Sequence, residues 1–160
     1  VGGTEFAGVV VETGTKVTQF AVGDKVFGFD DGILSSYAEY LTIKQDKGIA
    51  TMPENLSFEA AAASTEGVHY AFNFLNKVEL KAGDNALVNG ASGGIGSATV
   101  QLLRYQGVHV TAVCNTKNLE LVKSLGAPRV IDYTMEDFTK DDETYHFVFD
   151  SERALCLFRN

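Results

Sequence analysis

The chain has 160 residues, of which 45% are hydrophobic and 21% are charged, so it can bury a core and is not expected to be disordered. Its formal net charge of −8 argues against broad contact with nucleic acid or with an anionic membrane surface. No apolar run approaches the roughly 20 residues that span a bilayer, and the two cysteines lack metal-type spacing. We therefore expect a soluble, cytoplasmic protein with reduced thiols at Cys114 and Cys156.

The N-terminal third, residues 1–53, predicts a compact antiparallel β unit. Short β-rich runs alternate there with turns that contain glycine or acidic residues. These runs read FAGVVVE, DKVFGF and YAEYLTI, at residues 6–12, 24–29 and 37–43. We take them as the strands of the unit.

Helical character replaces this β pattern from Leu56 onward. Ser57 can begin a helix because its hydroxyl can accept a backbone N–H from the first turn. Alanines fill positions 60–63, and the apolar positions 71, 72 and 75 continue one face at helical spacing. We therefore expect a helical region over residues 56–77.

Strands and helices alternate in the rest of the chain, which predicts an α/β domain with a parallel sheet and right-handed crossovers. The expected strands cover residues 86–90, 108–114, 129–133 and 145–150. The expected helices cover residues 96–105 and 119–125, and the second of them ends at Gly126.

A glycine-rich segment joins the first of these strands to the first helix. Residues 91–96 read ASGGIG, an A-x-G-x-x-G variant of the dinucleotide-binding fingerprint. Gly93 lets the backbone approach a pyrophosphate, and Gly96 lets the helix press onto the strand, while N–H groups at the helix start attract the anion. We therefore assign Ser92, Gly93, Gly94, Ile95 and Gly96 to cofactor binding. A tight turn without a ligand is the alternative.

The end of the second strand decides between the two nicotinamide dinucleotides, since the adenosine ribose is bound there. NAD-preferring sites usually carry an acid at this place, whereas residues 114–118 read CNTKN and contain none. Lys117, with the Thr116 hydroxyl, could hold a 2′-phosphate through charge-assisted hydrogen bonds. We therefore assign Asn115, Thr116 and Lys117 to the binding of NADPH. An ordinary solvated lysine at position 117 is the alternative.

Together these segments resemble the medium-chain dehydrogenase/reductase superfamily, in its zinc-independent quinone oxidoreductase branch. Six stretches match in order and spacing and cover nearly all of residues 1–150: GTEFAGVVVETGTKVTQFAVGDKVFGF, YAEYLTI, PENLSFEAAAA, LKAGDNALVNGASGGIGSATVQL, LVKSLGAPRVIDY and YHFVFD. The resemblance implies an α/β chain with a GroES-like β domain portion at residues 1–55 and a connecting helix region at 56–79. An incomplete Rossmann domain, with a doubly wound parallel sheet that binds NADPH, would follow at 80–160.

The resemblance also implies that the chain is incomplete. It begins inside the family's catalytic domain, and after Asp150 it reads SERALCLFRN where the family continues with a glycine-containing turn and the rest of the sheet. We expect a fragment, a truncated product or an altered C-terminus.

Two further site residues come from the resemblance. The segment EGVHYAF lies where the family has a helix turn near the nicotinamide, often reading GLT, and it has His69 in place of the threonine. His69 is a candidate to bond the carboxamide or to supply a proton, or else it satisfies a backbone group under Tyr70 and Phe72. Tyr133, in VIDY, matches a family tyrosine beside the adenosine phosphate, although it is equally suited to packing.

Zinc is not expected. Zinc-dependent members of the superfamily carry a GHE segment whose histidine binds the catalytic metal, and this chain has Thr4 in that place. Neither cysteine belongs to a structural-zinc cluster, and His69, His109 and His146 have no ligand spacing. Without zinc as a Lewis acid, the hydride acceptor must already be electron-poor, as quinones and α,β-unsaturated carbonyl compounds are.

We therefore expect an NADPH-dependent oxidoreductase that reduces a quinone or an enal without zinc. The alternatives are a non-catalytic NADPH-binding or structural protein of the same fold and an inactive truncated fragment. The expected partner is the small-molecule substrate, without nucleic acid or membrane, and a homodimer is left open.

Overall fold

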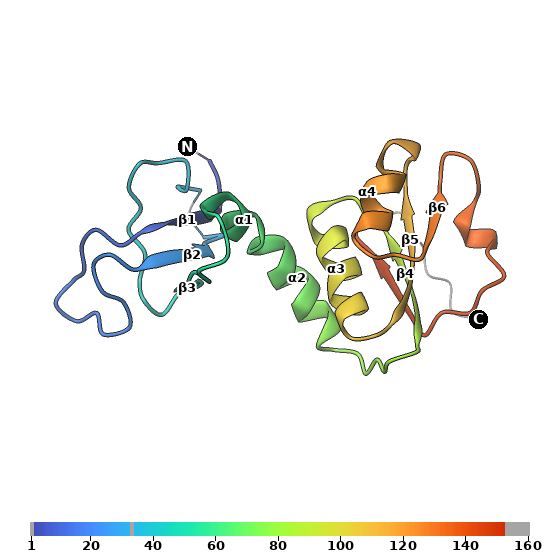
Figure 1. The fold of residues 1–160 in the computed structure, drawn as a ribbon, viewed down its shortest axis with the longest axis horizontal. Helices are drawn as coiled ribbons and strands as arrows, with labels where there is room; N and C mark the ends of the chain where they lie inside the picture. Colours follow the sequence, from blue (N-terminus) through green and yellow to red (C-terminus); the bar gives the residue numbers. More distant parts are fainter. Residues whose placement is uncertain (1, 33, 153–160) are drawn as a thin grey trace. The chain divides into compact units, whose positions relative to one another are not determined.

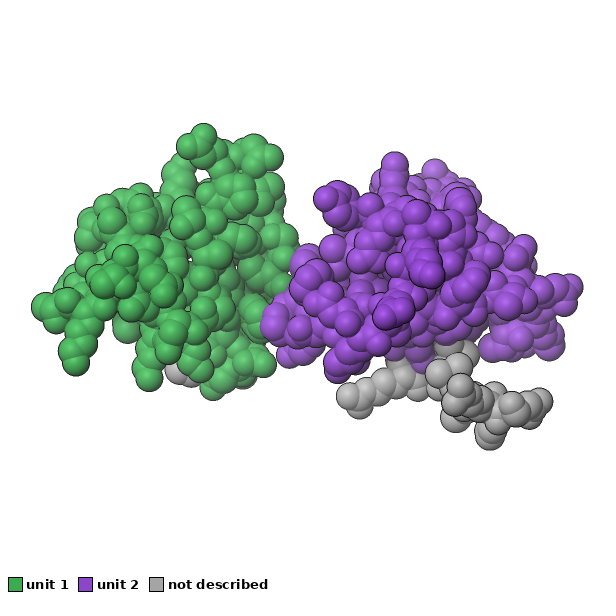
Figure 2. All heavy atoms as spheres, turned by 90° about the horizontal axis from the view of Figure 1, so that it is seen from below, with its two compact units in different colours: residues 1–66 green, residues 67–160 purple. Residues whose placement is uncertain are grey.

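The structure is a computed structural model that describes residues 2–32 and 34–152. Figure 1 shows its elements, and Figure 2 shows its two compact units, residues 1–66 and 67–160. The division falls at the start of helix α2 (Glu66–Leu75). Cys156 and most of the SERALCLFRN segment lie outside the described residues. Within the described part, no helix has the length and apolar character needed to cross a membrane.

The first unit contains the antiparallel sheet that the sequence predicts. Its strands are β1 (Glu5–Val9), β2 (Lys25–Phe29) and β3 (Ile49–Thr51), and they lie in the order β1-β2-β3 (Figure 1). Helix α1 (Phe58–Ala63) contacts β1 and β2. The Ser57 hydroxyl caps this helix by accepting the Ala60 N–H at 3.2 Å, as expected.

One predicted strand of this unit is wrong, and another was missed. Residues 37–43, YAEYLTI, form no strand, and the side chains of Tyr37 and Tyr40 are 85% and 76% exposed. The segment begins with two backbone bonds, from Ser36 and Tyr37 to the Gly2–Gly3 stretch, but no described strand pairs with it. Strand preference depends on a sheet surface to pack against, and these tyrosines have none. The third strand is instead β3, which pairs with residues 26–28 of β2.

The expected helical region is not continuous, because it breaks between α1 and α2. The hydroxyl groups of Ser64 and Thr65 donate to the carbonyl oxygens of Ala61 and Ala62, at 2.9 and 2.8 Å. Such bonds from side chain to backbone satisfy the carbonyls that end α1 and compete with continuation of the helix. A new helix then begins at Glu66.

The second unit contains a four-stranded parallel sheet, which confirms the predicted α/β fold. Its strands are β4 (Asn85–Asn89), β5 (His109–Cys114), β6 (Arg129–Asp132) and β7 (Phe147–Asp150), in the order β6-β5-β4-β7. Helix α3 (Gly94–Tyr105) joins β4 to β5. The short helix η1 (Thr116–Asn118) and α4 (Leu119–Ser124) join β5 to β6, and η2 (Phe138–Lys140) lies before β7. The strand order reverses between β4 and β7, which makes the carboxyl end of β4 the expected ligand position.

Apolar side chains cover both faces of this sheet, as parallel strands require. The larger cluster joins one face to α3, α4 and the end of α2; its fully buried members include Val88, Val100 and Leu103. Each such side chain contributes roughly 1.5–3 kcal/mol by leaving water. The opposite face carries a smaller cluster, with Leu87, Val113 and Ile131 buried under partly buried residues that include Phe138 and Tyr145.

Two glycines of the first sheet provide a test of its packing. A Cβ on Gly28 in β2 would collide with the Gly48 carbonyl oxygen and lie 2.9 Å from the Phe6 ring, whereas a Cβ on Gly8 in β1 would have nothing within 4 Å. We expect Gly28→Ala to destabilise this unit by about 1–3 kcal/mol. The control, Gly8→Ala, should cost nothing or stabilise by about 0.5 kcal/mol. Hydrogen exchange at the β1 and β2 amides measures both, and equal effects would contradict the packing described.

Candidate functional site

The turn between β4 and α3 is built around the carbonyl group of Gly90. This oxygen accepts the Gly93 N–H at 3.0 Å, and Gly90 itself has a φ of +75°, which favours glycine. A Cβ on Gly96 would collide with the same oxygen and lie 2.8 Å from the carbonyl carbon. Packing within the chain therefore accounts for the glycines at positions 90 and 96.

The glycines at positions 93 and 94 have no such explanation in the described residues. A Cβ on Gly93 would meet only the Gly90 oxygen, at 3.4 Å, and a Cβ on Gly94 would have nothing within 4 Å. The backbone of Gly93 has φ −77° and ψ 167°, which most residues can adopt. What the two glycines leave clear is the space before α3, where the first N–H groups of a helix have no intrahelical acceptor and attract anions.

A pocket of about 640 Å³ lies at the carboxyl ends of the strands, beside this turn. It includes three of the residues predicted to bind cofactor, Ser92, Asn115 and Tyr133. The full described lining is Asn89, Gly90, Ser92, Cys114, Asn115, Tyr133, Thr134, Met135, Glu136, Asp137, Phe138 and Glu152. Three of these side chains are acidic and none is lysine or arginine, so an additional phosphate needs a cation from outside this lining.

Residues after β5 lie at the edge of the pocket. The Oδ1 atom of Asn115 is buried and accepts no hydrogen bond from the described residues, so it is placed to accept one from a ligand hydroxyl. Lys117 is exposed on η1 and no described residue forms an ion pair with it. It is the cation nearest to Asn115 along the chain.

Thr116 is bonded differently from the prediction. Its hydroxyl donates to the Oδ2 atom of Asp132 at 2.6 Å, and Thr134 donates to the same carboxylate through its hydroxyl and its N–H, at 2.7 and 2.9 Å. These bonds lower the pKa of Asp132, which stays ionised. Burial, with the negative charge of Asp132, raises the pKa of the Cys114 thiol. Asp132 was not among the predicted site residues, and its only signal in the sequence is its place near the end of a predicted strand.

His69 lies on α2, exposed to solvent, and is not part of the pocket lining. Its Nε2 atom forms a hydrogen bond of 2.8 Å with the Asn73 amide, and its ring meets Tyr70 edge-on at 5.6 Å. The same helix does reach the turn, since a Cβ on Gly67 would lie 2.7 Å from the Gly94 carbonyl oxygen. The role of His69 stays a prediction.

Comparison with known proteins finds relatives that match over most of the chain. Residues 1–54 match the family model of the alcohol dehydrogenase GroES-like domain. The chain is 39% identical to the 2-methylene-furan-3-one reductase of Solanum lycopersicum and 36% identical to the chloroplastic NADPH-dependent alkenal/one oxidoreductase of Arabidopsis thaliana. Each match covers 94% of this chain and 41% of the relative. The solved quinone oxidoreductase of Coxiella burnetii is 35% identical, with a TM-score of 0.78 over 86% of this chain and 44% of that one.

The chain belongs to the medium-chain dehydrogenase/reductase superfamily. It spans about two fifths of the length of the curated relatives that it matches. The GroES-like part and the parallel sheet with its glycine turn are the portions of that fold present here.

The GTE segment, where zinc-dependent members of the superfamily have GHE, bonds within the first unit. The Thr4 hydroxyl donates to the Oε2 atom of Glu66 at 2.5 Å. The Glu5 carboxylate accepts the Glu66 N–H at 3.1 Å, which places a negative charge at the start of α2. The described residues contain no group of three or more His, Cys, Asp or Glu side chains that could hold a metal ion.

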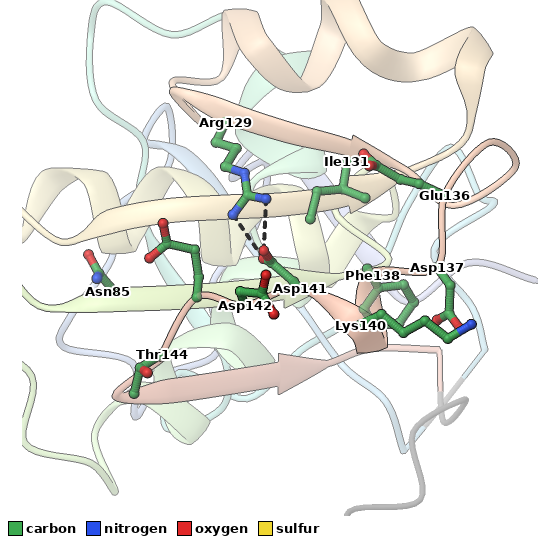
Figure 3. A pocket seen from close by; sticks show the side chains of 11 residues that line it. Asn85, Arg129, Ile131, Glu136, Asp137, Phe138, Lys140, Asp141, Asp142 and Thr144 are labelled. Atoms are coloured by element: carbon green, nitrogen blue, oxygen red, sulfur yellow. Dashed lines mark hydrogen bonds and ion pairs between the residues drawn. The ribbon is translucent and has the colours of Figure 1, made fainter.

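A second pocket, of about 520 Å³, lies between β6 and the segment before β7 (Figure 3). Arg129 and Asp141 face each other in it and form two hydrogen bonds, of 2.8 and 2.9 Å. The other cation of its lining, Lys140, lies 3.4 Å from the Asp137 carboxylate. Because both cations are paired with aspartates, this pocket is a weaker candidate for an anionic ligand than the glycine turn.

The Arg129–Asp141 pair should make stability depend on pH in the acid range. The guanidinium of Arg129, with the Tyr145 hydroxyl, lowers the pKa of Asp141 to about 2. A carboxyl with a depressed folded-state pKa contributes stability above its unfolded value of about 4, and that contribution is lost as the pH falls through about 2. Urea unfolding from pH 5 to pH 2 should show a steeper loss for wild type than for Asp141→Asn. The neighbouring exposed Asp142→Asn is the control, and it should follow wild type.

Proposed function

We propose that the chain forms the dinucleotide-binding part of an NADPH-dependent oxidoreductase that transfers hydride to a quinone or an α,β-unsaturated carbonyl compound without zinc. The observation that carries this proposal is the space left by Gly93 and Gly94 before α3, which packing does not require. The relatives support it, since they include proteins named as a quinone oxidoreductase and as an NADPH-dependent alkenal/one oxidoreductase.

Different residues of the second unit would bind the pyrophosphate, the adenosine ribose and the 2′-phosphate of the cofactor. The start of α3 faces the pyrophosphate with free N–H groups and with the positive end of the helix dipole. The buried Asn115 Oδ1 accepts a hydrogen bond from a ribose hydroxyl, and Lys117 offsets the charge of a 2′-phosphate beside an otherwise acidic pocket. Tyr133 lines the same pocket, with half of its side chain exposed. A bound nicotinamide supplies the hydride.

Proton supply and zinc independence are the finer parts of the proposal. His69 is the candidate proton donor, on the helix whose first turn contacts the glycine turn through Gly67. The bond between Thr4 and Glu66 supports a site without zinc, because a threonine hydroxyl committed to a carboxylate is a poor substitute for an imidazole ligand.

The four glycines of the turn divide into two pairs that mutation can separate. We expect Gly93→Val to weaken NADPH at least about tenfold, since its side chain fills the space before α3, while stability falls by only about 1 kcal/mol. Gly96→Val should instead lose about 3 kcal/mol or more of stability through its collision with the Gly90 carbonyl. Calorimetric titration and urea unfolding measure the two effects. An unchanged NADPH dissociation constant in Gly93→Val would remove the proposed site.

Lys117 should decide the preference for NADPH over NADH. Reversing its charge in Lys117→Glu replaces attraction of the 2′-phosphate by repulsion, and it lets the new carboxylate accept a bond from the 2′-hydroxyl of NADH. For an exposed lysine, the ratio of the two dissociation constants should shift by roughly five- to tenfold against NADPH. Lys81→Glu, the same reversal before β4 and far along the chain from this edge, should leave the ratio unchanged. Equal ratios in all three proteins would show that Lys117 does not contact the phosphate.

The activity is tested by NADPH oxidation with a panel of quinones and enals, together with elemental analysis for zinc. Turnover of either substrate class at a zinc content far below one per chain is the expected result for the complete protein. NADPH binding without turnover of any acceptor would favour the alternative, a cofactor-binding protein without catalysis. The absence of NADPH binding would overturn both.

A further inference from the structure

The end of β7 is bonded to the glycine turn, although 61 residues separate the two in the chain. The Asn89 side chain, which is only 4% exposed, donates from Nδ2 to the Oδ1 atom of Asp150 at 2.9 Å. The same carboxylate oxygen accepts the Glu152 N–H at 3.0 Å. Asp150 therefore fixes both the last residue of β4 and the backbone that follows β7.

Ser151, which follows β7, bonds directly to the backbone at the start of the glycine turn. Its hydroxyl donates to the Asn89 carbonyl oxygen at 2.9 Å and lies 3.3 Å from the Gly90 carbonyl oxygen. Its N–H also donates to the Asn89 oxygen, at 3.2 Å. The Gly90 oxygen is the one that accepts the Gly93 N–H, so the Ser151 hydroxyl and the amide just before the proposed anion site share one carbonyl group.

Gly90 is shaped to allow this approach. A Cβ on Gly90 would collide with the Ser151 hydroxyl and lie 2.7 Å from the Glu152 side chain. The positive φ of Gly90 turns the chain away from β4 while its Cα stays in contact with Ser151. The hydroxyl thus occupies the space that a side chain at position 90 would take.

We propose that Ser151 is a positioning residue for the pyrophosphate turn, with Asp150 holding it in place. The Ser151 hydroxyl lies within hydrogen-bond distance of two successive carbonyl oxygens, that of Asn89 and that of Gly90, and so orients the Gly90 carbonyl on which the turn folds. That orientation keeps the Gly93 amide bonded inward and leaves the amides at the start of α3 aimed at the ligand. This inference rests on the proposed function. It assigns part of the same site to the end of β7, a contribution that the glycine motif alone does not reveal.

The test compares a ligand that contains a pyrophosphate with one that lacks it. In Ser151→Ala, the dissociation constant for NADPH should rise about five- to tenfold, the effect of one lost hydrogen bond. The constant for 2′-AMP, which has the adenosine end alone, should stay within about twofold. Ser124→Ala is the control, because Ser124 also donates to a backbone carbonyl, at 2.7 Å, but lies on α4. It should bind both ligands as wild type does.

Amide hydrogen exchange gives a second measurement that needs no ligand. The Gly93 N–H should exchange faster in Ser151→Ala, while the Ala91 N–H, bonded to the Val113 oxygen at 3.0 Å, should keep its wild-type rate. Equal weakening of NADPH and 2′-AMP, or an unchanged NADPH constant, would overturn the positioning role. If the wild-type protein binds neither ligand, the proposed function itself fails. If the wild-type protein and Ser151→Ala bind NADPH equally well, only the positioning role of Ser151 fails.

Discussion

The carbonyl group of Gly90 is the contact around which the second unit is arranged. Helix α3 can approach β4 only because Gly96 has no Cβ to strike this oxygen, and the turn closes because the Gly93 amide bonds to it. The approach lets Val100 and Leu103 of α3 reach the sheet and be fully buried there. One peptide group thus connects the packing of the core to the shape of the proposed anion site.

The sheet order β6-β5-β4-β7 explains why the site draws on segments that are far apart in the chain. Parallel strands deliver their carboxyl ends to one edge, so the residues after β4, β5, β6 and β7 meet there although up to about 60 residues separate them. Three of the four strands bring polar groups to this edge: an amide from Asn115 after β5, a carboxylate from Asp132 at the end of β6 and a hydroxyl from Ser151 after β7. Hydrogen bonds between side chains across this edge, among them Thr116 to Asp132 and Asn89 to Asp150, link neighbouring strand ends.

Local sequence predicted those features that depend on local chemistry. The Ser57 cap, the apolar strand before the glycine turn, the helix after it and the helix end at Gly126 each follow from a few adjacent residues, and the structure has all of them. The strand expected at residues 37–43 failed because its tyrosines have no described sheet face to cover. The helix breaks at Ser64 and Thr65 because their hydroxyl groups bond to particular backbone carbonyls. The helical pattern of the sequence does not specify these bonds.

The contacts between strand ends that the sequence did not predict depend on register between strands. Asp132 meets Thr116 because Cys114 is paired with Asp132 across β5 and β6, and a shift of one residue would turn these side chains to opposite faces. The glycine motif, by contrast, is visible in the sequence. Only the structure shows which of its glycines are required by packing within the chain and which are not. A related sequence that keeps glycine at the positions of 90 and 96 and has lost it at 93 and 94 would retain the domain without the selective pressure of a bound ligand. In aligned relatives, glycine at the positions of 90 and 96 would therefore mark the fold, and glycine at the positions of 93 and 94 would mark the proposed binding function.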